Sequence, residues 1–255
     1  MRQTRLIMGM PITIEVTRGE LVESVGAGNA ATIESVFDYF RAIDERFSTY
    51  KETSEISRIN RGEIAPADMS SAMREVFEIA ERTRHETGGY FDIKRPDGSI
   101  DPSGIVKGWS ILHAARLLEA ADCTDFFVDA GGDIASRGKN ESGTDWSVGI
   151  RNPFNREEII KVIYPRGAGV ATSGSYIRGA HIYDPHDPSK ALDEIVSITV
   201  IGPDVLEADR FATAAFAMQH AGIEFIERMS GLEGYMIDRA GTATMTSGFE
   251  RYTAV

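Results

Sequence analysis

The chain has 255 residues, of which 42% are hydrophobic and 26% charged, a composition that excludes the disordered, collagenous and coiled-coil classes. The length allows a sizeable core, and because no Pro/Ser-rich linker or internal repeat divides the sequence, we expect one domain over residues 1–255. The formal net charge of −12 disfavours nucleic acid as a partner, because phosphates would meet repulsion over most of the surface.

A small phosphorylated ligand remains compatible with this charge where helix N-termini or a divalent metal supply positive charge. The single cysteine, Cys123, excludes an internal disulfide framework and a multi-cysteine metal site. The N-terminus has two arginines but no apolar stretch long enough for a signal peptide, and nothing elsewhere approaches a membrane span of about 20 apolar residues. We therefore expect a cytoplasmic protein that has no membrane partner.

Helical patterns dominate the first half of the chain. Alternation in PITIEVT predicts a first strand over 5–17, and the spacing of apolar residues predicts helices over 28–48, 54–60, 69–89 and 104–121. The segment VGAGNAAT at 25–32 contains G-x-G-x-x-A, the outline of a dinucleotide-binding turn. No second parallel strand follows it, so we interpret it as a glycine-rich loop, which disfavours an NAD-linked oxidoreductase.

Strand patterns dominate the second half. Strands are predicted over 125–130, 146–150, 158–164, 169–174 and 195–202, a helix over 205–219, a short helix over 223–230 and a closing hairpin over 234–247. Asp204 and Glu207 form a D-x-x-E variant of the capping box, which starts the 205–219 helix near Val205. Helices first and consecutive strands later favour the α+β class.

The 205–219 helix carries a carboxylate and a hydroxyl one turn apart, Asp209 and Thr213, among small and apolar residues. A buried carboxylate needs a partner. One alternative is an ion pair with an arginine or lysine elsewhere, with Thr213 bonded back to a carbonyl of its own helix. The other is a hard divalent cation such as Mg²⁺, which prefers carboxylate, hydroxyl and carbonyl oxygens. Spacing alone leaves both open and leans toward the ion pair.

Three further segments carry polar groups that suit a site. IDPSGIVKGW places Asp101 and Lys107 near a helix N-terminus, which attracts anions, although ordinary capping by Asp101 explains the same residues. FFVDAGGDIASRG brings two aspartates to a glycine turn. HIYDPHDPS holds His181, Asp184 and His186, a group that suits metal binding or acid–base chemistry and is equally typical of a surface turn.

Taken in order, these segments resemble the ApbE family of FAD:protein FMN transferases over nearly the whole chain. The matching stretches are MGMPITI, FSTYKETSEISRIN, GGYFDI, DPSGIVKGWS, VDAGGDIASRG, VATSGSY, HIYDP, SITVIGPDVLEADRFATAAFAM and GYMIDRAG. The resemblance implies a two-lobed α+β fold with mixed or antiparallel sheets packed by helices. It also implies a Mg²⁺-dependent enzyme that transfers FMN from FAD to a threonine or serine hydroxyl of an acceptor flavoprotein, leaving AMP.

Site residues follow from the same resemblance. Asp209, Thr213 and an oxygen at Gly104 would hold Mg²⁺, and the catalytic pair would be Asp209 and His181, the histidine being suited to assist proton transfer. Contacts to FAD would come from Met8, Tyr50, Tyr90, Phe91, Asp92, Asp101, Lys107 and Tyr183.

One departure from the family pattern is the short KRPDGSI segment at 94–100, where the usual member has a longer insertion. Two alternatives remain open from the sequence: a pyrophosphatase that uses water and yields FMN and AMP, and a protein that stores FAD without chemistry.

Overall fold

The computed structural model describes residues 1–19, 25–175 and 182–253. Its helices and strands in chain order are β1 (Arg2–Ile7), β2 (Met10–Gly19), α1 (Val25–Phe47), α2 (Glu55–Asn60), α3 (Ser71–Glu86), α4 (Ser103–Ala120), β3 (Cys123–Ala130), β4 (Asp133–Arg137), β5 (Val148–Asn152), β6 (Asn155–Ile163), β7 (Gly169–Gly174), β8 (Ile195–Gly202), α6 (Val205–Ala217), α7 (Ala221–Arg228), β9 (Glu233–Asp238) and β10 (Ala243–Met245). The predicted α+β class is confirmed.

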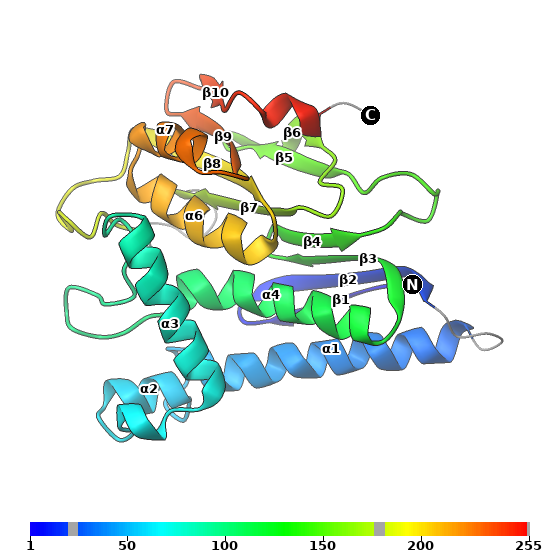
Figure 1. Ribbon diagram of the computed structural model, residues 1–255, viewed down its shortest axis with the longest axis horizontal. Helices are drawn as coiled ribbons and strands as arrows, with labels where there is room; N and C mark the ends of the chain where they lie inside the picture. Colours follow the sequence, from blue (N-terminus) through cyan, green and yellow to red (C-terminus); the bar gives the residue numbers. More distant parts are fainter. Residues whose placement is uncertain (20–24, 176–181, 254–255) are drawn as a thin grey trace.

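One eight-stranded sheet runs through the molecule in the order β1-β2-β3-β4-β7-β8-β9-β10, and every neighbouring pair is antiparallel. Helices cover one face: α4 packs on β3 and β4, and α6 packs on β7 and β8 (Figure 1). The two halves of the sheet meet at β4 and β7, whose register is a single residue pair, Ile134 opposite Val170. This narrow junction gives the two lobes that the family resemblance implies.

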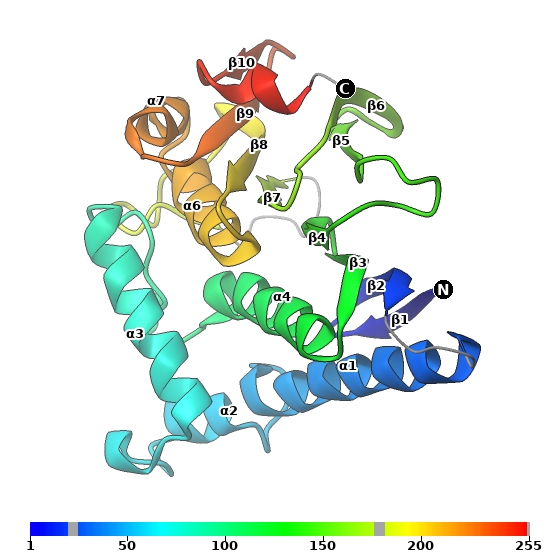
Figure 2. The same ribbon diagram turned by 45° about the vertical axis from the view of Figure 1, so that its right-hand side comes forward.

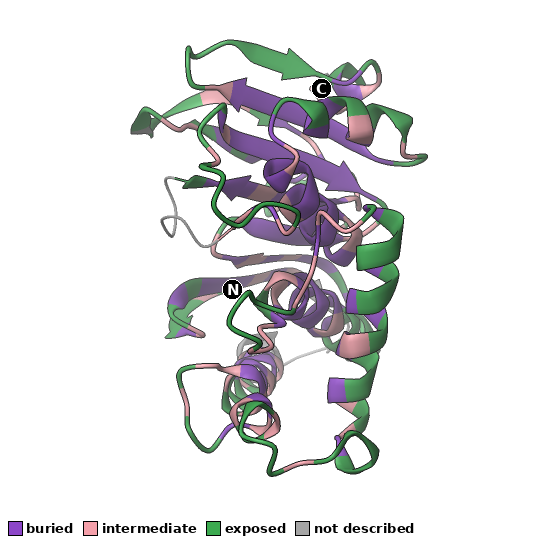
Figure 3. Cartoon of the chain, turned by 90° about the vertical axis from the view of Figure 1, so that its left-hand side faces the viewer, coloured by how far each residue is buried: buried purple, intermediate pink, exposed green. Residues whose placement is uncertain are grey.

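Apolar residues gather in three groups. The first fills the space between the β1–β3 half of the sheet and helices α1, α3 and α4, and the second lies between β7–β9 and helices α6 and α7. The third lies on the opposite face, where the separate β5–β6 hairpin covers the sheet (Figure 2). Because its two faces are both covered, β8 is buried nearly throughout, which explains its mainly apolar sequence IVSITVIG (Figure 3).

Two predictions about local structure are wrong. The strand expected over 5–17 is a hairpin, because Met8 and Gly9 take positive φ angles of 55° and 70° and turn the chain between β1 and β2. The glycine-rich segment interpreted as a loop belongs to α1, which begins at Val25. Each glycine costs about 1 kcal/mol in a helix, and the burial of Phe37 and Phe40 further along α1 offsets this cost.

The remaining predicted elements are confirmed within a few residues, and β4 is an additional strand. Asp204 caps α6 as expected, because its carboxylate accepts a hydrogen bond of 2.9 Å from Glu207 N. Within the described residues, no helix is long and apolar enough to cross a membrane. The cytoplasmic location and the assignment of all 255 residues to one domain stay predictions.

Candidate active site

The site begins where α4 crosses α6, at Gly108. A Cβ atom on this glycine would lie 2.8 Å from the Cβ of Asp209 and 2.9 Å from the carbonyl oxygen of Val205, so only glycine lets the two helices approach this closely. The same crossing brings the first turn of α4 beside the middle of α6. At Gly104, a Cβ would lie 2.9 Å from the ring of Phe91 and 3.7 Å from the methyl group of Thr213.

Asp209 is held at this crossing with 2% of its surface exposed. Its Oδ2 accepts a hydrogen bond of 2.8 Å from Gly108 N, and its Oδ1 lies 3.2 Å from the Lys107 ammonium. Burial raises the pKa of Asp209 to about 7; the Lys107 charge opposes the rise and the Asp133 charge adds to it. The ion-pair alternative for Asp209 is therefore realised, with Lys107 as its partner.

Asp133 is a second buried carboxylate that the sequence left without a role. It is 1% exposed, its Oδ2 lies 2.6 Å from the Lys107 ammonium, and its Oδ1 accepts a hydrogen bond of 3.1 Å from Thr172 N. Two carboxylates and one ammonium leave the group with a net charge of −1 when all are ionised. A further cation would balance it.

A cavity of about 100 Å³ opens beside this group. Nine of the twelve residues singled out from the sequence line it: Tyr90, Phe91, Asp92, Asp101, Gly104, Lys107, Tyr183, Asp209 and Thr213. Its wall also holds Arg95, an additional cation from the short 94–100 segment, which forms an ion pair with Asp101. A larger cavity of about 880 Å³ shares Gly131 and Thr172 with the first, so a ligand longer than the small cavity has room along the sheet.

Of the other three predicted residues, the two that the structure describes lie away from the small cavity. Met8 sits in the β1–β2 turn and packs against the first apolar group, and Tyr50 is 95% exposed; neither lines the small cavity. His181 lies outside the described residues, so its role stays a prediction.

The segment after His181 closes one side of the cavity. Tyr183 donates a hydrogen bond of 3.0 Å from its hydroxyl to the carbonyl of Lys94. The ring of His186 lies between two oxygens, with Nε2 at 3.0 Å from the Gly88 carbonyl and Nδ1 at 3.2 Å from Asp184. It also meets the ring of Tyr90 edge-on. These contacts give His186 and Asp184 a structural role in joining the 182–187 segment to the wall that carries Tyr90.

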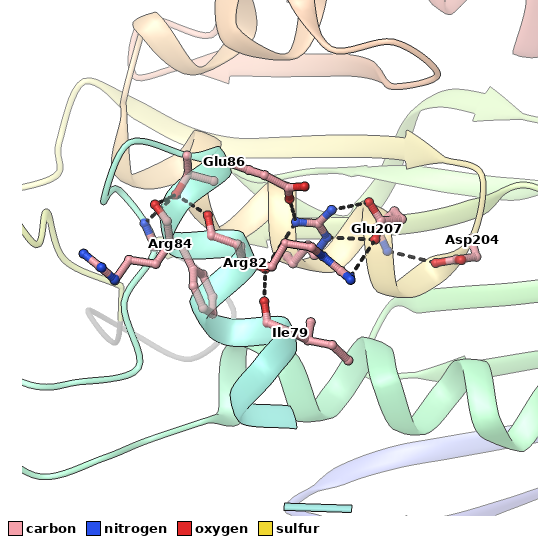
Figure 4. A network of polar contacts seen from close by, with 10 residues as sticks. Ile79, Arg82, Arg84, Glu86, Asp204 and Glu207 are labelled. Atoms are coloured by element: carbon pink, nitrogen blue, oxygen red, sulfur yellow. Dashed lines mark hydrogen bonds and ion pairs between the residues drawn. The ribbon is translucent and has the colours of Figure 1, made fainter. Parts of the chain in front are cut away.

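A buried arginine network fixes α6 to α3. Arg210 is 3% exposed and forms ion pairs with Glu207 and with Glu86, and its guanidinium donates a hydrogen bond of 3.2 Å to Thr83. Figure 4 shows the network running from Glu86 on α3 to Glu207 on α6. Because Arg210 follows Asp209 directly, the network also holds the part of α6 that presents the buried carboxylate to the cavity.

Comparison with known proteins decides the family. The sequence model of the ApbE family matches residues 8–96 and 93–236. The chain belongs to the ApbE family. Its relatives include a FAD:protein FMN transferase of Salmonella typhimurium, 27% identical over an alignment of 287 residues that covers 88% of this chain and 82% of that protein. Another, from Klebsiella pneumoniae, is 34% identical over 160 residues, which are 59% of this chain and 46% of that protein.

Solved structures of the family share the fold. The flavin transferase ApbE from Vibrio cholerae superposes with a TM-score of 0.84 at 21% identity and covers 99% of this chain and 98% of that chain. The ApbE protein from Thermotoga maritima superposes with a TM-score of 0.85 at 20% identity, and the superposition covers 100% of this chain and 99% of that chain. At these identities the likeness establishes the ApbE fold.

Proposed function

We propose that the chain transfers FMN from FAD to a serine or threonine hydroxyl of an acceptor protein and releases AMP. The observation that supports this most strongly is the small cavity in which Asp209, Thr213 and Lys107 lie together with Tyr90 and Phe91. The relatives named FAD:protein FMN transferase match most of this chain. The chemistry of the cavity suits an anionic dinucleotide and a hard cation.

An acidic chain needs local positive charge to bind a diphosphate. The first turn of α4 begins at Ser103 in the wall of the cavity, where the positive end of the helix dipole favours an anion, although the Ser103 N–H group itself is already bound to the Asp101 carboxylate. The Lys107 ammonium lies one turn further along the same helix, and Arg95 adds a guanidinium at the wall. The aromatic ring of Tyr90 offers a surface for a ring system of FAD.

The oxygens at the helix crossing fit a divalent cation. Asp209 supplies a carboxylate, Thr213 a hydroxyl and Gly104 a backbone carbonyl, and these are the donors that Mg²⁺ prefers. Within the described residues no three His, Cys, Asp or Glu side chains gather into a metal site, so the set relies on the hydroxyl and the carbonyl. When Asp133, Lys107 and Asp209 are all ionised, their net charge of −1 favours a cation here.

The reaction forms one bond and breaks one. The acceptor hydroxyl oxygen bonds to the phosphorus of the FMN half, and the bond from that phosphorus to the bridging oxygen breaks, so AMP leaves with the bridging oxygen. Mg²⁺ at Asp209 and Thr213 would neutralise charge on the diphosphate. Lys107 would bind the diphosphate oxygens, and the hydroxyl proton would pass to His181, whose ring suits a general base.

The test incubates the full chain with FAD, MgCl₂ and a flavin-acceptor protein, and follows AMP release and flavin fluorescence on a denaturing gel. We expect both products, and their loss by at least about 100-fold in Asp209→Asn. The surface variant Asp44→Asn, whose carboxylate pairs with Lys51 away from the cavity, serves as the control and should keep full activity. AMP without labelled acceptor would instead indicate a pyrophosphatase, and bound FAD without either product would indicate storage.

A further inference from the structure

The Lys107 ammonium is shared unequally between two buried carboxylates. It lies 2.6 Å from Asp133 and 3.2 Å from Asp209, and the Lys107 side chain itself is 18% exposed. Both carboxylates are nearly inaccessible to solvent, so the position of the ammonium between them sets how much of the negative charge on each one stays unbalanced. The shorter distance places the ammonium on the side of Asp133.

Asp133 is held in place independently of Asp209. It is the first residue of β4, directly after Gly131 and Gly132, whose positive φ angles of 64° and 98° make the tight turn from β3. Its Oδ1 accepts a hydrogen bond from Thr172 N on β7, at the junction of the two halves of the sheet. One oxygen of the carboxylate therefore accepts a hydrogen bond from a strand N–H group, and the other forms the ion pair with Lys107.

We propose that Asp133 is a positioning residue: it holds the Lys107 ammonium on its own side, so that Asp209 and Thr213 are left to bind a divalent cation. This inference rests on the proposed function. Without the charge of Asp133, the ammonium would shift to Asp209 and neutralise it. A divalent cation would then have to displace a lysine from its buried anionic partner, which is costly.

The experiment measures the stabilisation of the full chain by MgCl₂ alone, as the concentration that gives half of the maximal rise in melting temperature. We expect Asp133→Asn to raise this midpoint about tenfold, because Asp209 then competes for Mg²⁺ against Lys107. In the Lys107→Met background the same Asp133→Asn change should raise the midpoint less than about threefold, because no ammonium is left to shift.

The matched control is Asp129→Asn, which removes the same charge from a neighbouring strand. Asp129 accepts a hydrogen bond of 2.8 Å from Gly132 N, and asparagine can keep that bond. We expect its Mg²⁺ midpoint to stay within about threefold of the wild-type value. This comparison does not depend on the Lys107 variant, so it still tests the inference if Lys107→Met fails to fold.

Two results would overturn the inference. One is a rise in the Mg²⁺ midpoint on Asp133→Asn that is equal in the wild-type and Lys107→Met backgrounds. The other is a rise in the midpoint of Asp129→Asn as large as that of Asp133→Asn. Either would mean that Asp133 acts through general charge or as a direct ligand. FMN transfer by the wild-type chain is measured beside the titrations. If the wild-type chain transfers FMN but the midpoints rise equally in both backgrounds, only the positioning role is rejected. If the wild-type chain neither transfers FMN nor is stabilised by Mg²⁺, the proposed function and this inference are rejected together.

Discussion

Replacing Asp209 with asparagine removes a carboxyl group whose pKa burial raises from 3.8 to about 7. A carboxyl group with a higher pKa in the folded than in the unfolded state binds its proton more tightly when folded. The stability that it contributes is therefore fully present below about pH 4 and is lost as the pH rises through 7. A rise of about three units corresponds, at about 1.4 kcal/mol per unit, to roughly 4 kcal/mol.

The assay is urea unfolding of the wild type and of Asp209→Asn between pH 4 and pH 8 in EDTA, followed by circular dichroism. Asparagine keeps an oxygen that can accept the hydrogen bond from Gly108 N, and it does not ionise. The pH dependence contributed by the other carboxyl groups is common to both proteins and cancels in the comparison. We expect the wild type to lose about 4 kcal/mol relative to the variant across this range. A difference between the two proteins that is the same at pH 4 and pH 8 would refute the reasoning.

Asp238 provides a control of opposite sign. Its exposed carboxylate accepts a hydrogen bond from Thr242 N, which lowers the pKa of Asp238. The stability that this group contributes is therefore present at neutral pH and is lost as the pH falls through the lowered pKa. When the assay is extended below pH 4, the wild type should lose stability relative to Asp238→Asn as the pH falls. Relative to Asp209→Asn, in contrast, it loses stability as the pH rises from 4 to 8.

Three further predictions concern the frame of the site. Arg210→Met should lower the free energy of unfolding by urea by about 3 kcal/mol, because Glu86 and Glu207 then lose their buried guanidinium partner. The control Arg239→Met removes an exposed ion pair and should lower it by less than about 0.5 kcal/mol. Gly108→Ala should lower the melting temperature and cost about 2 kcal/mol or more, because its Cβ would overlap α6; an unchanged melting temperature would contradict the close crossing. Tyr183→Phe should weaken FAD binding about fivefold in a fluorescence titration with little change in kcat, because the hydroxyl no longer binds the Lys94 carbonyl; an equal fall in kcat would point to a chemical role instead.

Local signals in the sequence were sufficient to predict α6 and the burial of Asp209 within it. Its capping residue Asp204, the helical spacing of its apolar residues and the buried setting of Asp209 all depend on residues within a few positions of one another. The cavity residues followed from the family motifs rather than from physical patterns. The motifs alone did not show that Met8 and Tyr50 lie away from the small cavity, because that depends on how the β1–β2 turn and the end of α1 are placed.

The partners of Asp209 could not be predicted, because they lie far away in the sequence. Lys107 and Asp133 reach it only through the close crossing of α4 and α6 at Gly108 and through the turn that starts β4. One signal for Asp133 was available: two adjacent glycines between a strand and a second aspartate, as in DAGGD, indicate a tight turn that brings both aspartates to one strand end. The hairpin at Met8 was missed because methionine continues the apolar alternation.

The most direct test of the account compares two amounts in one reaction, the AMP released from FAD and the FMN attached to the acceptor. The full chain is incubated with FAD and MgCl₂, and the acceptor is analysed intact by mass spectrometry beside a variant in which its target threonine is valine. The account predicts equal amounts of AMP and acceptor-bound FMN, with neither formed in EDTA, by Asp209→Asn or on the valine variant. AMP released without FMN on the acceptor, or full transfer by Asp209→Asn, would contradict it.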